Sequence, residues 1–201
     1  MKRLMNIILC ICLIALCFPV ANADETDRVF DKAALLSSDD ISIINAKIKD
    51  FQTTTSMDFV VLSSNEPHEK MSQSSIADSF YDENGFGLDD VKSGVLLFID
   101  MAERQVYIST TGNMIDILTD SRIESVLDII VPSLTATDYK GAILDGMVAI
   151  LAYIKDGIPF GQFRCDIETG EIVSTGGETI ISLFQRVKDL EKRVTNLETT
   201  E

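Results

Sequence analysis

Hydrophobic residues along the middle of the chain follow two different spacings, which predict helices and strands in turn. The clearest helix is 39–53, where apolar residues recur every three or four positions behind Asp39 and Asp40, two acids typical of a helix start. The same pattern predicts four helices, over 39–53, 72–83, 120–131 and 138–156. Asp120 is expected to cap the third of these helices, and Pro132 to end it.

Three short apolar runs between these helices predict strands. They cover 57–62, 94–99 and 105–110, and the residues before them, 24–36, form an initial segment with an apolar end. The run 94–99 is apolar throughout, as in a central strand covered on both faces. Because only five residues join it to 105–110, these two strands are expected to form an antiparallel hairpin. The order of elements predicts an α/β fold with a small mixed sheet sandwiched between helices.

The first residues have the layout of an export signal. Lys2 and Arg3 precede the apolar run 7–18, and Ala21-Asn22-Ala23 has the small residues of a cleavage site. We therefore predict a signal peptide over 1–23 with cleavage after Ala23, and a secreted or extracytoplasmic protein. The alternative is an uncleaved membrane anchor, although the apolar run is shorter than the roughly 20 residues of a spanning helix.

The residues after the last predicted helix divide into two parts. A small hairpin and a Gly-containing linker are expected over 157–177, and a coiled-coil tail over 178–201. In the tail, β-branched residues alternate with Leu at spacings of three and four, a pattern that favours a parallel homodimer. The alternative is a single helix folded back on its own domain. The predicted seam consists of Ile180, Leu183, Val187, Leu190, Val194 and Leu197.

Charge and cysteine content exclude several kinds of protein. The formal net charge of −15 becomes −17 after removal of the leader and argues against nucleic acid as a partner, because phosphate binding requires clustered Lys and Arg. Cleavage would leave Cys165 as the only cysteine, so no internal disulfide can form. We expect Cys165 to be buried as a small apolar residue, with an intermolecular disulfide as the alternative.

The residues with potential chemistry are mostly acids at the ends of strands and helices. His68 is the only histidine and lies in a polar loop, where we expect a surface residue. Carboxylates beyond the carboxyl ends of strands favour Ca²⁺ or Mg²⁺ over zinc. The alternative is that each Asp only caps a turn or a helix. The acids in such positions are Asp31, Asp89, Asp90, Asp100 and Asp120.

A set of short motifs occurs in order through the central part of the chain. They are Val29-Phe30-Asp31-Lys32-Ala33 with Leu36-Ser37, Gly94-Val95-Leu96-Leu97, Arg104, Ile108-Ser109-Thr110-Thr111-Gly112, Asp120, Pro132 and Asp138-Tyr139. Over about 28–156 this ordered set resembles the TPM domain. That family includes thylakoid-lumen proteins of photosystem II repair, a nematode acetylcholine-receptor modulator and many exported bacterial proteins.

The resemblance implies which residues form the site. Asp31, Asp100 and Asp120 would be metal ligands, with calcium bound in some relatives, and Arg104 and Gly112 would have binding or structural roles. Arg104 is expected to pair with a carboxylate or to orient an anionic group. Met114 replaces a small residue of the motif, which puts the shape of that loop in question.

Two functions follow from these observations. The first is an exported, non-catalytic module that binds a divalent cation, without an organic cofactor, and a protein partner at the cell envelope. The alternative is a metal-dependent hydrolase resembling an acid phosphatase, the activity described for a plant relative. The absence of familiar nucleophile and nucleotide-binding motifs favours the first function.

Overall fold

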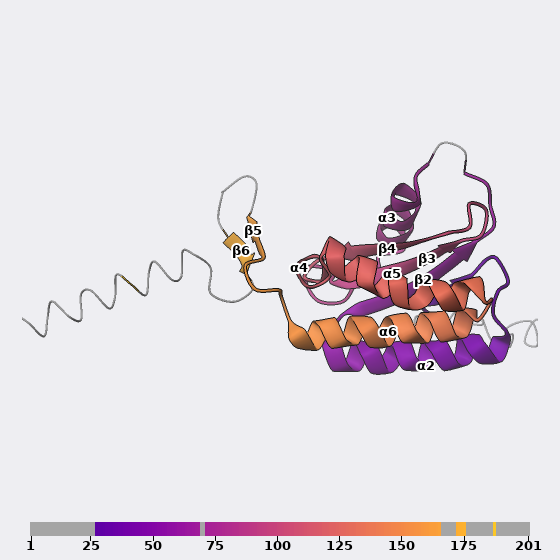
Figure 1. Cartoon of the computed structure of the whole chain (residues 1–201), viewed down its shortest axis with the longest axis horizontal. Coiled ribbons are helices and arrows are strands. Elements are labelled where there is room, and N and C mark those ends of the chain that lie inside the picture. Colours follow the sequence, from indigo (N-terminus) through magenta and orange to yellow (C-terminus); the bar gives the residue numbers. More distant parts are fainter. Residues whose placement is uncertain (1–26, 69–70, 166–171, 176–186, 188–201) are drawn as a thin grey trace, which may run out of the picture.

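The computed structural model describes residues 27–68, 71–165, 172–175 and 187. A four-stranded sheet lies between two unequal layers of helices (Figure 1). Its strands are β1 (Val29–Asp31), β2 (Asp58–Ser64), β3 (Gly94–Asp100) and β4 (Gln105–Thr111). The predicted α/β fold with a small mixed sheet between helices is confirmed.

The strands are arranged in sequence order across the sheet. β1, β2 and β3 are parallel, and β4 returns antiparallel to β3 as the predicted hairpin requires. β1 was expected only as an irregular initial segment. Its three residues pair with Val61, Leu62 and Ser63 of β2, so the parallel part of the sheet is one strand wider than predicted.

Five helices accompany the sheet in the described part of the chain. They are α2 (Ser38–Thr55), α3 (Gln73–Glu83), α4 (Met114–Ile117), α5 (Asp120–Thr135) and α6 (Tyr139–Asp156). The prediction that Pro132 ends α5 is wrong. The helix runs on to Thr135, because proline lacks only one N–H and its carbonyl still accepts the N–H of Ala136. The N-cap of α5 is Thr119, so Asp120 lies in the first turn of the helix and does not cap it.

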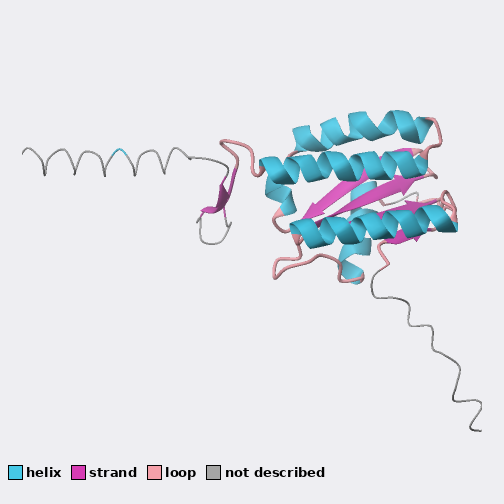
Figure 2. Ribbon diagram, turned by 90° about the horizontal axis from the view of Figure 1, so that it is seen from below, coloured by secondary structure: helices cyan, strands magenta, loops and turns pink. Residues whose placement is uncertain are grey.

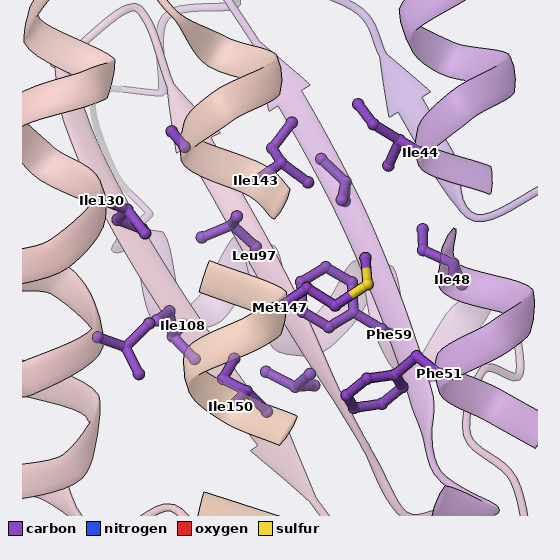
Figure 3. Packing of buried hydrophobic residues seen from close by; sticks show 14 of the residues in the cluster. Ile44, Ile48, Phe51, Phe59, Leu97, Ile108, Ile130, Ile143, Met147 and Ile150 are labelled. Atoms are coloured by element: carbon purple, nitrogen blue, oxygen red, sulfur yellow. The ribbon is translucent and has the colours of Figure 1, made fainter. Parts of the chain in front are cut away.

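Alternation along β2 and β3 gives the sheet two apolar faces. Phe59, Val61 and Leu97 face α2, α5 and α6, whereas Val60 and Phe98 face α3. Figure 2 shows three long helices side by side over the first of these faces. In the close view of Figure 3, side chains of α2, α5 and α6 fill the space above the strands. Both strands are completely buried, as the apolar run of β3 predicted.

The amino ends of the parallel strands are held by one buried carboxylate. Asp58 is 0% exposed and accepts hydrogen bonds from Arg28 Nε at 3.0 Å, Gln52 Nε2 at 2.7 Å and the backbone N–H of Gly87 at 3.0 Å. The ring of Phe86 lies 5.2 Å from the guanidinium of Arg28. This network joins β1, α2, β2 and the loop after α3.

The chain beyond α6 is described only in part. β5 (Phe163–Cys165) and β6 (Ile172–Thr175) form an antiparallel pair, and Cys165 is exposed, so the expectation of a buried thiol is wrong. None of the helices in the described ranges is long and apolar enough to cross a membrane. The predicted signal peptide lies outside the described residues, as does the predicted coiled coil except for Val187, whose side chain is exposed.

Candidate functional site

The carboxyl ends of the three parallel strands form one edge of the sheet. β1 ends at Asp31, β2 at Ser64 and β3 at Asp100. Neighbouring strands are about 4.8 Å apart, so Asp31 and Asp100 are separated by about 10 Å. Ligands of open α/β sheets bind at this edge. Polar groups from several elements gather at this edge.

Asp31 organises the loop that follows β1. Its carboxylate accepts the backbone N–H groups of Leu35 at 3.0 Å and Leu36 at 2.8 Å. It also accepts the hydroxyl of Ser63, which brings β2 into the same network. Three donors therefore hold the Asp31 carboxylate, and it positions the chain that leads into α2.

Asp100 is 1% exposed and accepts four N–H groups. Its Oδ1 accepts the backbone N–H groups of Ala102 at 3.1 Å and Glu103 at 3.2 Å, which fixes the turn between β3 and β4. Its Oδ2 accepts His68 Nε2 at 2.6 Å and Gln73 Nε2 at 3.3 Å. The lone pairs of this carboxylate are thus in use.

His68 is held by two acceptors. Nδ1 lies 3.0 Å from the carbonyl of Met71, and Nε2 lies 2.6 Å from Asp100 Oδ2. A carbonyl and a carboxylate can only accept, so both ring nitrogens must donate and the ring is an imidazolium. The expectation of a surface histidine is wrong, because the side chain is 9% exposed and secures the loop after β2 to the end of β3.

The two groups stabilise each other's charged form. The hydrogen bond to Asp100, followed by that to the Met71 carbonyl, raises the pKa of His68 above its usual value. Burial opposes ionisation of Asp100, but hydrogen bonds from His68, Glu103 and Gln73 outweigh it and hold the pKa of Asp100 below its usual value. The hydrogen bonds therefore favour an imidazolium on His68 beside a carboxylate on Asp100.

A pocket of about 190 Å³ opens beside this pair, between the start of β4 and the carboxyl end of α5. Its walls are largely apolar, and Ile99, Val106 and Leu134 contribute to them. The polar part of its lining comes from Asp100, Arg104, Gln105, Thr135, Thr137 and Tyr139. Apolar walls with a few polar groups are typical of ligand pockets.

Arg104 is a charged residue of this pocket that has no charged partner among the residues that the structure describes. It directly precedes β4, and its backbone φ of +53° lies in the left-handed region that residues other than glycine seldom adopt. Its side chain is exposed, and it forms no hydrogen bond or ion pair with another described residue. The expected pairing of Arg104 with a carboxylate is therefore not seen in the described part of the chain.

The predicted site residues fall into separate groups. Asp31 and Asp100 share the carboxyl edge, whereas β4 leads the chain away from it to Gly112, α4 and Asp120 at the other end of the sheet. Gly112 has a φ of +58°, and a Cβ there would lie 2.6 Å from the carbonyl of Val91, so glycine is required structurally. Met114, in place of the small motif residue, is fully buried at the start of α4.

The calcium ion that the family resemblance implies does not fit these acids as they are arranged. Among the described residues, no three His, Cys, Asp or Glu side chains gather closely enough to hold a metal ion. The carboxylates of Asp31 and Asp100 already accept N–H or O–H donors, and Asp120 is exposed at the other end of the sheet.

The sequence analysis missed two contributors to this edge. His68 and Gln73 both bind Asp100, from positions 32 and 27 residues earlier in the chain. The only signal for His68 was its place in the loop that follows a strand ending at the same edge. No local pattern indicates Gln73, because a glutamine at the first position of a helix is unremarkable by itself.

Comparisons with known proteins agree with this architecture. The family model of the TPM domain matches residues 29–153. The N-terminal domain of a P. gingivalis protein is 20% identical, with a TM-score of 0.57 over 67% of this chain and 85% of that domain. For the N-terminal domain of the cg2496 protein of Corynebacterium glutamicum, the identity is 18% and the TM-score 0.51, over 67% and 84%.

A third solved structure has the same fold. The BA42 protein of the psychrophilic bacterium Bizionia argentinensis is 16% identical, with a TM-score of 0.54 over 62% of this chain and 84% of that protein. No curated protein sequence matches the chain significantly. At these identities the likeness concerns the fold, whereas the family model covers more than half of the chain. The chain belongs to the TPM domain family.

Proposed function

We propose that this TPM domain is a non-catalytic binding module that receives an acidic group of a protein partner in the pocket beside Arg104. The observation that carries the proposal is the exposed guanidinium of Arg104, which has no partner among the described residues, at a pocket of about 190 Å³ with both apolar and polar walls. A guanidinium binds a carboxylate through two parallel N–H donors, which supplies orientation as well as charge.

The neighbouring groups support binding over reaction. Asp100 and His68 neutralise each other, so the charge of Arg104 faces the pocket without an opposing carboxylate from this pair. Both nitrogens of His68 donate to acceptors, and Asp31 and Asp100 are held by N–H or O–H donors. These three residues hold loops at the carboxyl edge of the strands through these hydrogen bonds, which favours a structural role for them over that of a base.

The partner we propose lies outside the cytoplasm, at the cell envelope. This part of the proposal rests on the sequence, in which a basic start, an apolar run and a small-residue site precede residue 24. It is tested by sequencing the amino terminus of the secreted protein. A terminus at Asp24 supports export, and a cell-associated protein that retains Met1 would contradict cleavage.

The binding proposal is tested with three acetylated, amidated peptides of alternating Val and Thr that end in Glu, Gln or Lys. Binding is measured by fluorescence polarisation. The Glu peptide should bind about tenfold or more tightly than the Gln peptide, since a charged hydrogen bond contributes about 1.5–3 kcal/mol. Arg104→Met should abolish this difference, and Arg104→Lys should retain part of it, because lysine keeps the charge but not the paired donors.

Lys47→Met is the matched control. Lys47 lies on α2 with a 59% exposed side chain, and its one ion pair within the described ranges is with Asp50, which is 73% exposed, so its loss removes one positive charge without touching the pocket. This variant should bind all three peptides as the wild type does. Equal affinity of the wild type for the Glu and Gln peptides would show that the pocket does not bind acidic groups selectively. An unchanged preference of Arg104→Met for the Glu peptide would show the same.

The hydrolase alternative draws its support from the family resemblance and from the cationic Arg104. Its test is hydrolysis of p-nitrophenyl phosphate with added Ca²⁺ or Mg²⁺, by the wild type and by an Asp100→Ala/Asp120→Ala double variant. We expect the same background rate for both proteins. A wild-type rate that depends on the cation and is lost in the double variant would establish a metal-assisted phosphatase instead.

Two further parts of the proposal concern a cation and self-association. Calcium at the carboxyl edge would have to displace His68 and Gln73 from Asp100, and calorimetry at millimolar Ca²⁺ tests whether it does. The heptad pattern of 178–201 supports a parallel homodimer. Sedimentation equilibrium should give a dimer that becomes a monomer when these residues are deleted. A monomer in both cases would contradict the homodimer.

A further inference from the structure

β4 is an edge strand whose outer side is unpaired. It is last in the strand order, and its only strand partner among the described residues is β3. Apart from that pairing, none of its seven residues takes part in a backbone hydrogen bond within the described ranges. Alternate residues of an edge strand direct their N–H and C=O groups outward, so β4 presents a row of free donors and acceptors.

This edge lacks the features that usually prevent strand addition. The sequence of β4, QVYISTT, contains no charged residue and no proline, and its register with β3 runs through seven consecutive pairs without a bulge. β1, the opposite edge of the sheet, is only three residues long. Proteins normally shorten, charge or bend exposed edges, because an unprotected edge pairs with other chains. An edge kept open in this way is suited to a partner.

We propose that β4 binds an extended segment of a protein partner as a fifth strand, antiparallel to β4, with an acidic residue near its carboxyl end held by Arg104. The acidic anchor rests on the proposed function of the pocket, whereas the added strand rests on the open edge. In this mode the main-chain hydrogen bonds supply affinity and the pocket supplies specificity.

The position of Arg104 determines the direction of the added strand. Arg104 directly precedes β4, and the pocket is lined by Gln105 and Val106 from the start of that strand. Only an antiparallel segment brings its carboxyl end to this point. Val131 and Leu134 of α5 also line the pocket and would contact the apolar part of the anchoring residue.

A second copy of this chain fits the edge less well than a partner. Two copies paired antiparallel about Ile108 would place Arg104 opposite Gly112 of the other copy, which has no charge to offer. Each copy would also bring a formal net charge of −15. A segment with a carboxylate at one end satisfies both the backbone groups of β4 and the charge of Arg104.

The experiment begins with random octapeptides selected on the purified full chain by phage display. The best-enriched peptide is then synthesised in versions that carry one N-methyl group at each position in turn. N-methylation removes a backbone donor, so it should weaken binding about fivefold or more at every second residue and about twofold or less at the residues between. Ser109 and its neighbours in β4 should show slower amide exchange when the peptide is bound.

The outcomes separate this inference from the proposed function. Binding that depends on Arg104 but tolerates N-methylation at every position would overturn the added strand and leave the acidic pocket in place. Alternating sensitivity without any effect of Arg104→Met would overturn the acidic anchor while the added strand stands. A selection that enriches no peptide at all would overturn both, one that enriches only peptides without an acidic residue would overturn the anchor, and a dimer that forms through β4 without peptide would show that the occupant is a second copy.

Discussion

Replacement of Asp58 by Asn provides a quantitative test of the network at the amino ends of the strands. The Asn side chain keeps the shape of Asp but has no charge. Its amide N–H groups would face N–H donors whose hydrogen bonds Asp58 now accepts. Asp58 is completely buried, and its carboxylate lies 3.0 Å from Arg28 Nε. Removing one partner of a buried ion pair lowers the free energy of unfolding by about 3–5 kcal/mol.

The expected loss in the free energy of unfolding is measured by urea denaturation, and the matching fall in melting temperature by heating, both followed by circular dichroism. In a domain of this size about 1 kcal/mol corresponds to about 4 °C, so the melting temperature should fall by about 10–20 °C. Asp145→Asn is the matched control, because Asp145 is exposed on α6 and the same change removes one negative charge. The control should remain within about 0.5 kcal/mol of the wild type.

The reasoning would be refuted by a loss below about 1 kcal/mol in Asp58→Asn. That result would mean that Arg28, Gln52 and Gly87 find other acceptors or water when the carboxylate is gone. A loss equal to that of the Asp145→Asn control would show that the network adds nothing to stability. The double variant with Arg28→Met separates the ion pair from the remaining hydrogen bonds, since the two losses should then fall short of additive.

Three further changes test other parts of the structure. Gly94→Ala should lower the free energy of unfolding in urea by about 1–3 kcal/mol, because its Cβ would lie 2.1 Å from the hydroxyl of buried Tyr81, and a stable variant would refute this packing. Gly112→Ala should cost about 1–2 kcal/mol for its left-handed backbone, measured in the same way, and a neutral effect would mean that the loop rearranges. The raised pKa of His68 means that its contribution to stability is present below the usual histidine pKa and is lost as the pH rises through the raised value, whereas the contribution of Asp100, with its lowered pKa, is lost as the pH falls through the lowered value. The melting temperature of the wild type should therefore fall between pH 6 and pH 9 more than that of His68→Gln, and parallel curves would contradict the imidazolium.

The sequence was most informative where a pattern extends over many residues. β3 is apolar throughout and predicted a central strand, and the short linker after it predicted the hairpin with β4. These two elements place Asp100 at a strand end, so its position at a ligand-binding edge could be predicted. β1 was missed because three residues are too few to show a period, and its pairing with β2 depends on contacts made elsewhere in the fold.

The site itself was predicted only in part. Asp100 was placed at the correct end of its strand and Asp31 only in the initial segment, and two of the donors to Asp100 come from a loop and a helix distant in sequence. His68 and Asp100 are 32 residues apart, and the polar loop around His68 looks exposed until the fold brings it against β3. The charge of Arg104 was visible in the sequence. Its lack of a partner is a property of the folded chain.

The unequal helix layers have a consequence for how the domain opens. α2, α5 and α6 cover one face of the sheet with a large cluster, whereas the other face depends on α3 and a small cluster that includes Phe86 and Tyr81. Local unfolding is least costly where few apolar contacts are lost. Native-state hydrogen exchange should therefore find α3 opening as a separate unit before the rest.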